Sequence, residues 1–376
     1  MYFLIFIRNL RRVINIKLSD LILRSSRNYL KLQREDGSFK QGHNGPWDNK
    51  ETPVRNTAHI ALLLFKAYKI SGKNEYLLSA KRACDFIMLD KNRPNNFNFL
   101  CRTEGDRVNG LIGVSWALEP LIFIGKELKI NSYLEFSKKI IKMHNYDNKR
   151  NLWEIKNLNG TDGPVCMTLN QQIWFGMMVL TLGNATKDKS LIFVATRFFS
   201  NLSENIDYLG NGVLSHVVPK RGFKKWLIDV YELAKGNKDY IAERSMGYFP
   251  FLASGFALAY LNNKDSEIWK DEKMIRVIRF ILTSLKKNYS SDKFPNKNPF
   301  IGQYNPIGFE IAFTFQTFSH LGDFDQTEIK KWVEFQVRNY FNFDNGFMDK
   351  NTGDKEVLSA RLYESIYLKN YDLSIG

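Results

Sequence analysis

A helical hairpin that recurs along the chain is the feature that most constrains its fold. Residues 58–89 contain two runs of apolar residues spaced three and four apart, joined by a tight turn at Ser71-Gly72. This spacing is typical of amphipathic helices, and glycine is typical of turns. The same design returns at 113–144, 169–202, 247–285 and 307–341. Repetition of one supersecondary unit predicts a stacked architecture.

The segments between the hairpins form a second repeat. They are rich in Gly, Asn and Asp and carry one or two aromatic residues. They lie at 34–51, 91–107, 148–163, 207–222, 290–305 and 342–355. Their spacing is roughly 55 to 60 residues, with one longer interval before the fifth, as expected of stacked units. The extra length includes "FKKWLIDVYELAKGNKDYI", which we interpret as an inserted helix.

Two helical patterns, at 18–32 and 356–368, have no partner of their own next to them. They complete a sixth hairpin if the chain closes on itself. We therefore predict an all-α fold, an (α/α)6 toroid of six hairpins with the N-terminal helix pairing with the C-terminal helix. It would form one domain, 17–376, after an N-terminal extension, 1–16. An open solenoid is the alternative, but it would need polar caps.

Within each hairpin the two helices differ in polarity. The first is the more apolar, as in "IWFGMMVL", and should form an inner ring. The second carries Lys and Glu along one face, as in "EIKKWVEFQVR", and should form an outer ring with that face in water.

Composition and charge narrow the possible partners. The chain has 376 residues, of which 44% are hydrophobic and 14% aromatic, so it can build a large core. The net charge of +15 comes from Lys and Arg spread along the chain, which favours an anionic partner or simply solubility. Nucleic-acid binding has only this charge in its favour, since no recognised module is present. We expect no nucleic-acid partner.

The termini and cysteines indicate a cytoplasmic protein. Cys84, Cys101 and Cys166 are odd in number and lack metal-ligand spacing, which is typical of reduced thiols. At the N-terminus the apolar run precedes the charges, the reverse of a signal peptide, and is too short to span a bilayer. Residues 1–12 could instead make peripheral membrane contact, or pack on the domain. Zinc, redox and nucleotide motifs are absent, so we expect no metal and no cofactor.

Polar and aromatic residues cluster where each connector meets the next inner helix. In a toroid these six positions share one face, so their side chains should converge on a central cleft. The expected substrate-binding residues are Trp47, Asp48, Arg55, Arg107, Asn109, Trp116, Asn170, Gln171, Trp174, Arg244, Tyr304, Asn305 and Arg361. Aromatic faces stack on sugar rings, while amides, carboxylates and guanidinium groups bind hydroxyls. The alternative for any one of them is a helix cap or a core residue, and we interpret His59 as a satisfied interior histidine.

Two carboxylates stand inside apolar helices, where burial is costly unless they are partnered. They are Glu119 and Glu310. Glycoside hydrolysis requires two carboxylates across the scissile bond, so this is the leading catalytic pair. Asp106 and Glu243 are held in reserve.

Three strings carry a resemblance to a known family. "RVNGLIGVSWALEP", "TLNQQIWF" and "YNPIGFE" resemble the six-hairpin glycosidase-like superfamily, and within it uncharacterised proteins of bacterial surface-polysaccharide and O-antigen biosynthesis clusters. The resemblance covers most of the chain, from the "DGSF" turn to the last helix. It implies a carbohydrate-active or carbohydrate-binding toroid connected with surface glycan production. The fold does not fix the reaction.

Several reactions remain open on this scaffold. Glycoside hydrolase-like activity on an anionic oligosaccharide or polysaccharide is the first choice. A lyase would need an amide or Arg to neutralise a uronate. The string "NQQIW" resembles the Asn-His motif of toroidal lyases, but Gln171 replaces the histidine. Tyr248 or Tyr304 would then have to be the base. A uronyl epimerase would need two bases, and the histidines show no paired pattern. A non-catalytic glycan-binding or assembly protein is the last alternative.

Overall fold

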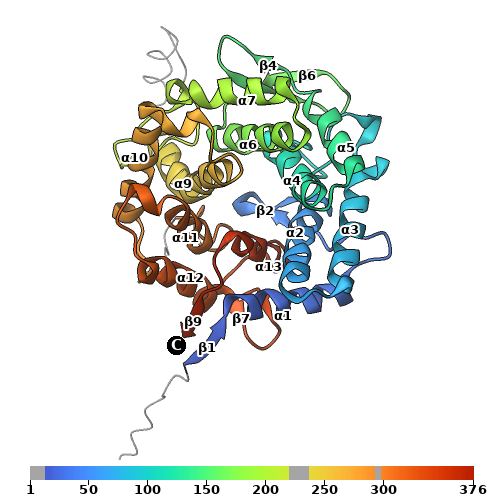
Figure 1. Cartoon of the computed structure of the whole chain (residues 1–376), viewed down its shortest axis with the longest axis vertical. Coiled ribbons are helices and arrows are strands. Elements are labelled where there is room, and N and C mark those ends of the chain that lie inside the picture. Colours follow the sequence, from blue (N-terminus) through green and yellow to red (C-terminus); the bar gives the residue numbers. More distant parts are fainter. Residues whose placement is uncertain (1–12, 220–236, 293–297) are drawn as a thin grey trace, which may run out of the picture.

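The computed structural model describes residues 13–219, 237–292 and 298–376. In this part of the chain twelve α-helices form two concentric rings, which Figure 1 shows in a view down the ring axis. Each inner helix contacts the inner helices on either side, and the outer helices lie around them. The predicted all-α toroid is confirmed. The N-terminal segment 1–12 and most of the predicted inserted helix lie outside the described residues.

The inner ring is continuous around the molecule. Its members are α2 (Val54–Ser71), α4 (Gly110–Leu128), α6 (Leu169–Thr186), α9 (Asn237–Leu261), α11 (Gly308–Thr317) and α13 (Lys355–Ala360), which continues as the 3-10 helix η7 (Arg361–Tyr367). Neighbours contact each other in this order, and η7 contacts both α11 and α2, so the ring is closed. These helices are apolar on nearly every side because protein surrounds them.

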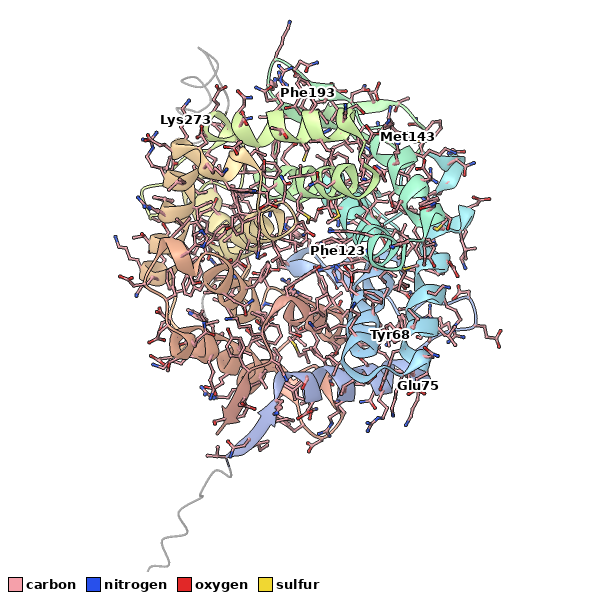
Figure 2. The ribbon with its side chains drawn as sticks, viewed as in Figure 1. Tyr68, Glu75, Phe123, Met143, Phe193 and Lys273 are labelled. Carbon is pink, nitrogen blue, oxygen red and sulfur yellow. The ribbon has the colours of Figure 1, made fainter. Side chains whose placement is uncertain are left out.

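The outer ring shields the inner one from water. It consists of α1 (Leu18–Leu32), α3 (Asn74–Met88), α5 (Asn131–Ile141), α7 (Lys189–Ser200), α10 (Glu272–Asn288) and α12 (Gln326–Tyr340). Three of these helices begin at an aspartate that accepts backbone N–H groups: Asp188, Asp271 and Asp325. Figure 2 shows outer-ring Glu75 and Lys273 at the periphery and inner-ring Phe123 near the centre.

A pair of terminal strands closes the ring. β1 (Ile14–Lys17) pairs antiparallel with β9 (Asp372–Ile375), with Ile14 opposite Ile375 and Lys17 opposite Asp372. The sequence predicted that the two ends meet, but it predicted helices rather than strands at the seam. β1 also begins inside the segment that we expected to be an extension. The closing contact is therefore partly a β-ladder.

The connectors contain short hairpins and single helical turns. The remaining strands are β2 (His43–Asn44), β3 (Asn49–Lys50), β4 (Tyr146–Asp147), β5 (Leu152–Lys156), β6 (Asp162–Val165), β7 (Phe341–Asn342) and β8 (Phe347–Met348). The 3-10 turns are η1 (Gly45–Trp47), η2 (Asp90–Asn92), η3 (Pro94–Asn96), η4 (Leu202–Asn205), η5 (Glu267–Lys270) and η6 (Ser319–Leu321). Among the described residues, no helix has the length and apolar character needed to cross a membrane.

Candidate active site

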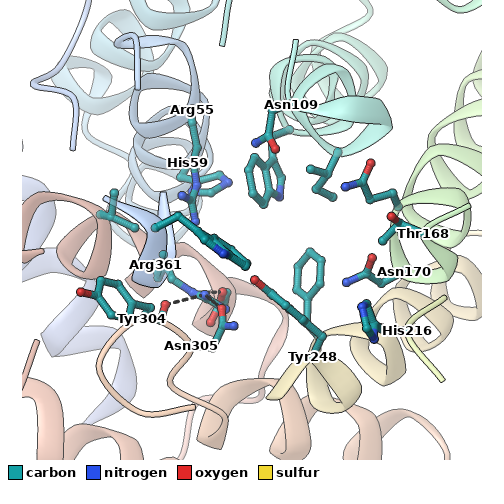
Figure 3. Close-up of a pocket in the computed structure, with 18 of the residues that line it drawn as sticks. Arg55, His59, Asn109, Thr168, Asn170, His216, Tyr248, Tyr304, Asn305 and Arg361 are labelled. Atoms are coloured by element: carbon teal, nitrogen blue, oxygen red, sulfur yellow. Dashed lines mark hydrogen bonds and ion pairs between the residues drawn. The ribbon is translucent and has the colours of Figure 1, made fainter. Parts of the chain in front are cut away.

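A polar pocket opens at the centre of the ring, where the connectors meet the inner helices (Figure 3). Its empty volume is about 800 Å³ including the open mouth, within the usual range for ligand pockets. Eleven of the residues predicted from the sequence line it: Trp47, Arg55, Asn109, Trp116, Asn170, Gln171, Arg244, Tyr248, Tyr304, Asn305 and Arg361. The described lining also includes Arg102, His59, Thr168, His216, Phe251, Tyr363 and Glu364.

The three consecutive amides at the start of α6 have three different roles. Gln172 is fully buried; its Oε1 accepts the Trp153 N–H at 3.0 Å, and its Nε2 donates to the carbonyls of Trp153 and Cys166, both at 2.8 Å. It therefore fixes the preceding connector to the helix. Asn170 points into the pocket, and its Oδ1 has no hydrogen-bond partner among the described residues.

Gln171 connects two neighbouring inner helices. Its Oε1 accepts the Leu111 N–H at 3.0 Å, at the first turn of α4. Gly110 makes this approach possible: its φ is +56°, and a Cβ there would lie 2.2 Å from Gln171 Oε1. Any other residue at 110 would be strained in its backbone and would collide with the amide. The contact sets the position of the pocket wall formed by the starts of α4 and α6.

Positive charge dominates the pocket lining. Four guanidinium groups line it, those of Arg55, Arg102, Arg244 and Arg361. The described lining contains a single carboxylate, that of Glu364. The starts of α4 and α6 also face this region, and the N-terminal ends of helices favour anions. The pocket is therefore suited to a ligand that carries negative charge.

Two of these arginines already have acidic partners. Arg55 Nη1 lies 3.1 Å from Glu51 Oε1. Arg361 Nη2 donates to Glu310 Oε1 at 2.6 Å, and its Nε donates to Glu364 Oε1 at 2.7 Å. Burial raises the pKa of the Glu310 and Glu364 carboxyl groups, and the charge of Arg361 opposes the rise. Arg361 thus holds Glu364 in the pocket wall and Glu310 below it.

Neither Arg102 nor Arg244 makes a salt bridge with an acidic group of the described residues. Burial lowers the pKa of Arg102, and the charges of Asp106 and Glu51 oppose this. Arg102 donates to Asn109 Oδ1, which orients the amide. Arg244 lies over two rings, with its guanidinium carbon 5.0 Å from the Trp47 centroid and 5.7 Å from the Tyr248 centroid. These aromatic faces hold the cation without neutralising it. Arg102 and Arg244 are therefore the groups best placed to bind an anionic ligand.

The predicted pair Glu119 and Glu310 lies below the floor of the pocket. Glu119 is fully buried and accepts a hydrogen bond from the Tyr367 hydroxyl at 2.8 Å, and burial raises the pKa of its carboxyl group to about 8. Glu310 lines a smaller cavity underneath, together with Glu364 and Tyr363, which line both cavities. The main pocket is therefore not flanked by two facing carboxylates among its described residues.

Five other predicted residues also lie outside the pocket lining. Asp106 and Glu243, the reserve catalytic residues, are exposed to solvent, as are Asp48 and Arg107. Trp174 lies under the floor, where its ring stacks on Phe251 at 4.8 Å and lines the lower cavity. Its indole N–H donates to the Phe251 carbonyl at 3.3 Å.

Sequence reasoning missed His216, which stands beside Asn170 in Figure 3. The Leu169 N–H donates to the His216 carbonyl at 2.7 Å, so a connector segment is fixed to the start of α6. The Nδ1 atom of His216 lies 2.8 Å from Ser245 Oγ, so the other ring nitrogen, Nε2, is left to interact with a ligand in the pocket. Burial and the charge of Arg244 lower the pKa of His216 to about 3, so the imidazole is neutral. No local motif marks this histidine, because its position depends on a distant contact.

His59 is an interior histidine, as interpreted, but the expectation that it is satisfied was wrong. Its side chain lines the pocket, and both ring nitrogens lack hydrogen-bond partners among the described residues. The ring stacks on Tyr363 with 4.0 Å between centroids. Burial, Arg55 and Arg361 hold the pKa of His59 well below its usual value, so it too is neutral. Among the described residues no cluster of three or more His, Cys, Asp or Glu side chains is placed to hold a metal ion.

Six helical hairpins arranged around a central polar pocket define the six-hairpin glycosidase-like fold, an (α/α)6 toroid. Comparison with solved structures agrees. A sugar epimerase from a ruminal bacterium superposes with a TM-score of 0.65 at 12% identity, covering 95% of this chain and 100% of that one. An unsaturated glucuronyl hydrolase specific for heparin gives 0.60 at 12% identity, covering 93% and 94%. At this level of identity the likeness establishes the fold alone.

One sequence relative covers nearly the whole chain. It is Archaeal glycosylation protein Q of Haloferax volcanii, which is 27% identical over 95% of this chain and 98% of its own length. No model of a known protein family matches the chain.

Proposed function

We propose that this protein is carbohydrate-active and holds an acidic sugar of a glycan in its central pocket. The observation that carries the proposal is the pair of guanidinium groups, Arg102 and Arg244, that face the pocket among aromatic rings and amides and make no salt bridge to an acidic group in the described part of the chain. Aromatic faces and amides suit a sugar ring, and guanidinium groups suit a carboxylate. The comparisons support the sugar: the sequence relative is a glycosylation protein, and the structural neighbours include a glucuronyl hydrolase.

The cellular setting is part of the same proposal. Similarity to a glycosylation protein supports a role in making or processing surface glycans. A cytoplasmic location, with peripheral membrane contact through residues 1–12, would bring the protein to lipid-linked saccharides on the inner membrane surface.

The reaction that this geometry favours is removal of the proton next to a uronate carboxylate. Arg244 and the Nδ2 group of Asn170 would donate to the carboxylate and stabilise the negative charge that develops when the neighbouring carbon loses its proton. If Nδ1 of His216 donates to Ser245 Oγ, then Nε2 has a free lone pair. Burial and Arg244 lower the pKa of His216 to about 3, so it would accept that proton only when the bound carboxylate offsets the charge of Arg244. Tyr248 is a buried phenol whose pKa is raised by burial, so it is protonated and can donate.

Two outcomes conserve atoms and charge. In elimination, the proton leaves C5 for His216, the C4–O bond breaks with its electron pair on oxygen, and Tyr248 protonates that oxygen, leaving a C4=C5 double bond. In epimerisation, His216 takes the C5 proton, Tyr248 gives its phenolic proton to C5 from the opposite face, and no other bond breaks. The pocket supplies a neutral base and a proton donor for either course, so we take a lyase or uronyl epimerase as the favoured reaction class.

Hydrolysis is the second candidate, and the buried carboxyl groups are the observation in its favour. Glu119 would be protonated near neutral pH because of its raised pKa, as a general acid must be, and Glu364 reaches the pocket. However, Glu364 is bound to Arg361, and Glu119 lines neither of the two cavities described above. If the protein only binds a glycan, then His216, Tyr248 and the buried carboxyl groups have no role in catalysis.

Product analysis separates these possibilities. The protein is incubated with uronate-containing polysaccharides, and products are read by mass spectrometry and ultraviolet absorbance. Elimination gives fragments lighter by one water than hydrolysis products, and they absorb ultraviolet light. Epimerisation leaves the mass unchanged and is read by NMR. Binding alone leaves the saccharide intact.

Two variants test the roles assigned. His216→Gln should lower turnover by about 10²- to 10⁴-fold, the usual contribution of a general base. His320→Gln is the matched control, since this histidine is exposed and does not line the pocket. Full turnover in His216→Gln would overturn the proton-transfer assignment.

Arg244→Gln should weaken the binding of D-galacturonate by about 10- to 100-fold and should weaken the binding of D-galactose much less. Equal affinity of the wild type for both sugars would overturn the acidic-ligand proposal.

A further inference from the structure

One face of α9 runs from the floor of the pocket to its rim. Tyr240, Arg244, Tyr248 and Phe251 follow one another at intervals of four, four and three residues, so they share a side of the helix. The last three line the pocket. Tyr240 is one turn further towards the start of α9, about 6 Å along the axis, and 46% of it is exposed. The side of α9 that lines the pocket therefore extends past the pocket lining to Tyr240.

A buried phenylalanine ties this tyrosine to a second aromatic residue on the rim. Phe300 packs edge-on against Tyr240 with 5.8 Å between centroids, and its ring lies 5.7 Å from that of Trp47. Trp47 is 38% exposed, although its ring is held by Arg244. Phe300 also contacts Tyr248 inside the pocket, at 6.1 Å. Two exposed rings are thus fixed in position on one buried side chain at the mouth.

An aromatic ring that is both exposed and fixed in place suits stacking on the apolar face of a sugar. The hydroxyls of such a sugar stay in water, while its C–H face covers the ring. The distance of one helical turn from Arg244 to Tyr240 is comparable to the length of one pyranose unit.

We infer that Trp47 and Tyr240 form a second sugar subsite. It takes the sugar next to the acidic one in the pocket, so the ligand is an oligosaccharide or the end of a longer chain rather than a free monosaccharide. The inference rests on the proposed function, because it takes the occupant of the pocket as its starting point.

Calorimetry with two probes tests the subsite. D-Galacturonate fills the pocket alone, and tri-galacturonate reaches the rim. We expect the wild type to bind the trisaccharide more tightly, and Tyr240→Ala to reduce the ratio of the two affinities by about 3- to 10-fold, the size of a typical aromatic stacking contribution. Tyr240→Phe should keep the ratio, because the ring is retained. Tyr208→Ala is the matched control: this tyrosine is 50% exposed and packs edge-on against Phe280, on the outer ring.

The outcomes are distinguishable. If the wild type binds both probes equally, or if Tyr240→Ala keeps the wild-type ratio, the second subsite is overturned and the acidic pocket stands. If D-galacturonate binds no better than D-galactose, the proposed function fails first and the inference fails with it. A fall in the ratio with Tyr208→Ala as large as with Tyr240→Ala would also overturn the subsite, since the effect would not be local.

Discussion

The carboxyl group of Glu119 is held in its protonated form by its surroundings. Burial raises its pKa from an ordinary 4.5 to about 8, while the hydrogen bond from Tyr367 partly opposes the rise. Between about pH 4.5 and pH 8, Glu119 is therefore protonated in the folded protein and ionised in the unfolded chain. Because the pKa is raised on folding, this contribution to stability is fully present below about pH 4.5 and is lost as the pH rises towards about 8.

Replacing Glu119 by Gln should remove that pH dependence. Glutamine is neutral at every pH, and its Oε1 can still accept from Tyr367. We expect Glu119→Gln to be more stable than the wild type at about pH 9, by on the order of a few kcal/mol, with a smaller difference at about pH 6. Thermal unfolding at both pH values measures this. Glu75→Gln, on the exposed face of α3, should unfold like the wild type at both; a wild-type pH profile in Glu119→Gln would contradict the assignment.

At the scale of single residues, the sequence predicted many of the residues that line the pocket, but it did not predict which of them could transfer a proton. Residues such as Arg55, Asn170 and Tyr304 could be predicted because they stand at helix starts that the repeat places on one face. His216 could not, since it reaches α6 only through a contact between distant segments. The buried state of Glu119 was visible in its apolar neighbours, but its position below the floor depends on which side of α4 faces the centre.

At the scale of elements, the start of α6 carries two neighbouring amides, Gln172 with structural contacts and Asn170, which we propose binds the ligand. Gln172→Ala would remove the partners that its side chain gives to the Trp153 N–H and the Cys166 carbonyl in a buried site, while the Trp153 carbonyl would keep the Cys166 N–H at 3.0 Å. Asn170→Ala would remove a side chain whose Oδ1 has no partner in the described structure. The two residues are neighbours in sequence and of similar chemistry, so each is a control for the other.

We expect Gln172→Ala to lower the free energy of unfolding by about 2–4 kcal/mol, because unsatisfied buried polar groups are costly. Asn170→Ala should unfold within about 0.5 kcal/mol of the wild type and should bind acidic saccharides more weakly. Urea denaturation monitored by tryptophan fluorescence gives the stabilities. Equal destabilisation by both substitutions would show that Asn170 also has a structural role.

On the scale of the whole molecule, closure of the ring determines whether the core is a single unit. Leu373 in β9 is buried at the seam with β1. We expect Leu373→Ala to cost about 2–4 kcal/mol and to keep one cooperative transition in calorimetry, because the hydrophobic core is continuous around the ring. Leu78→Ala, at an exposed position on α3, should change stability by less than about 0.5 kcal/mol. Two separate transitions would mean that the halves of the ring unfold independently.

The overall ring was predictable because periodic helices recur at fixed intervals and the two unpaired patterns at the ends require each other. The strands at the seam were not, since four-residue strands separated by almost the whole chain leave no local signature. The sequence pattern therefore determines how many hairpins there are, while the way in which the last one joins the first depends on tertiary contacts.

The position of η7 and β9 has a consequence for how the protein is made. Arg361, Tyr363 and Glu364 form part of the pocket wall, and β9 follows η7 in the sequence. A ribosome therefore delivers five hairpins before it delivers the wall that completes the pocket. A nascent chain that ends before residue 361 would lack this wall and the Arg361 partner of Glu310, so the proposed saccharide binding would begin only after translation has passed η7.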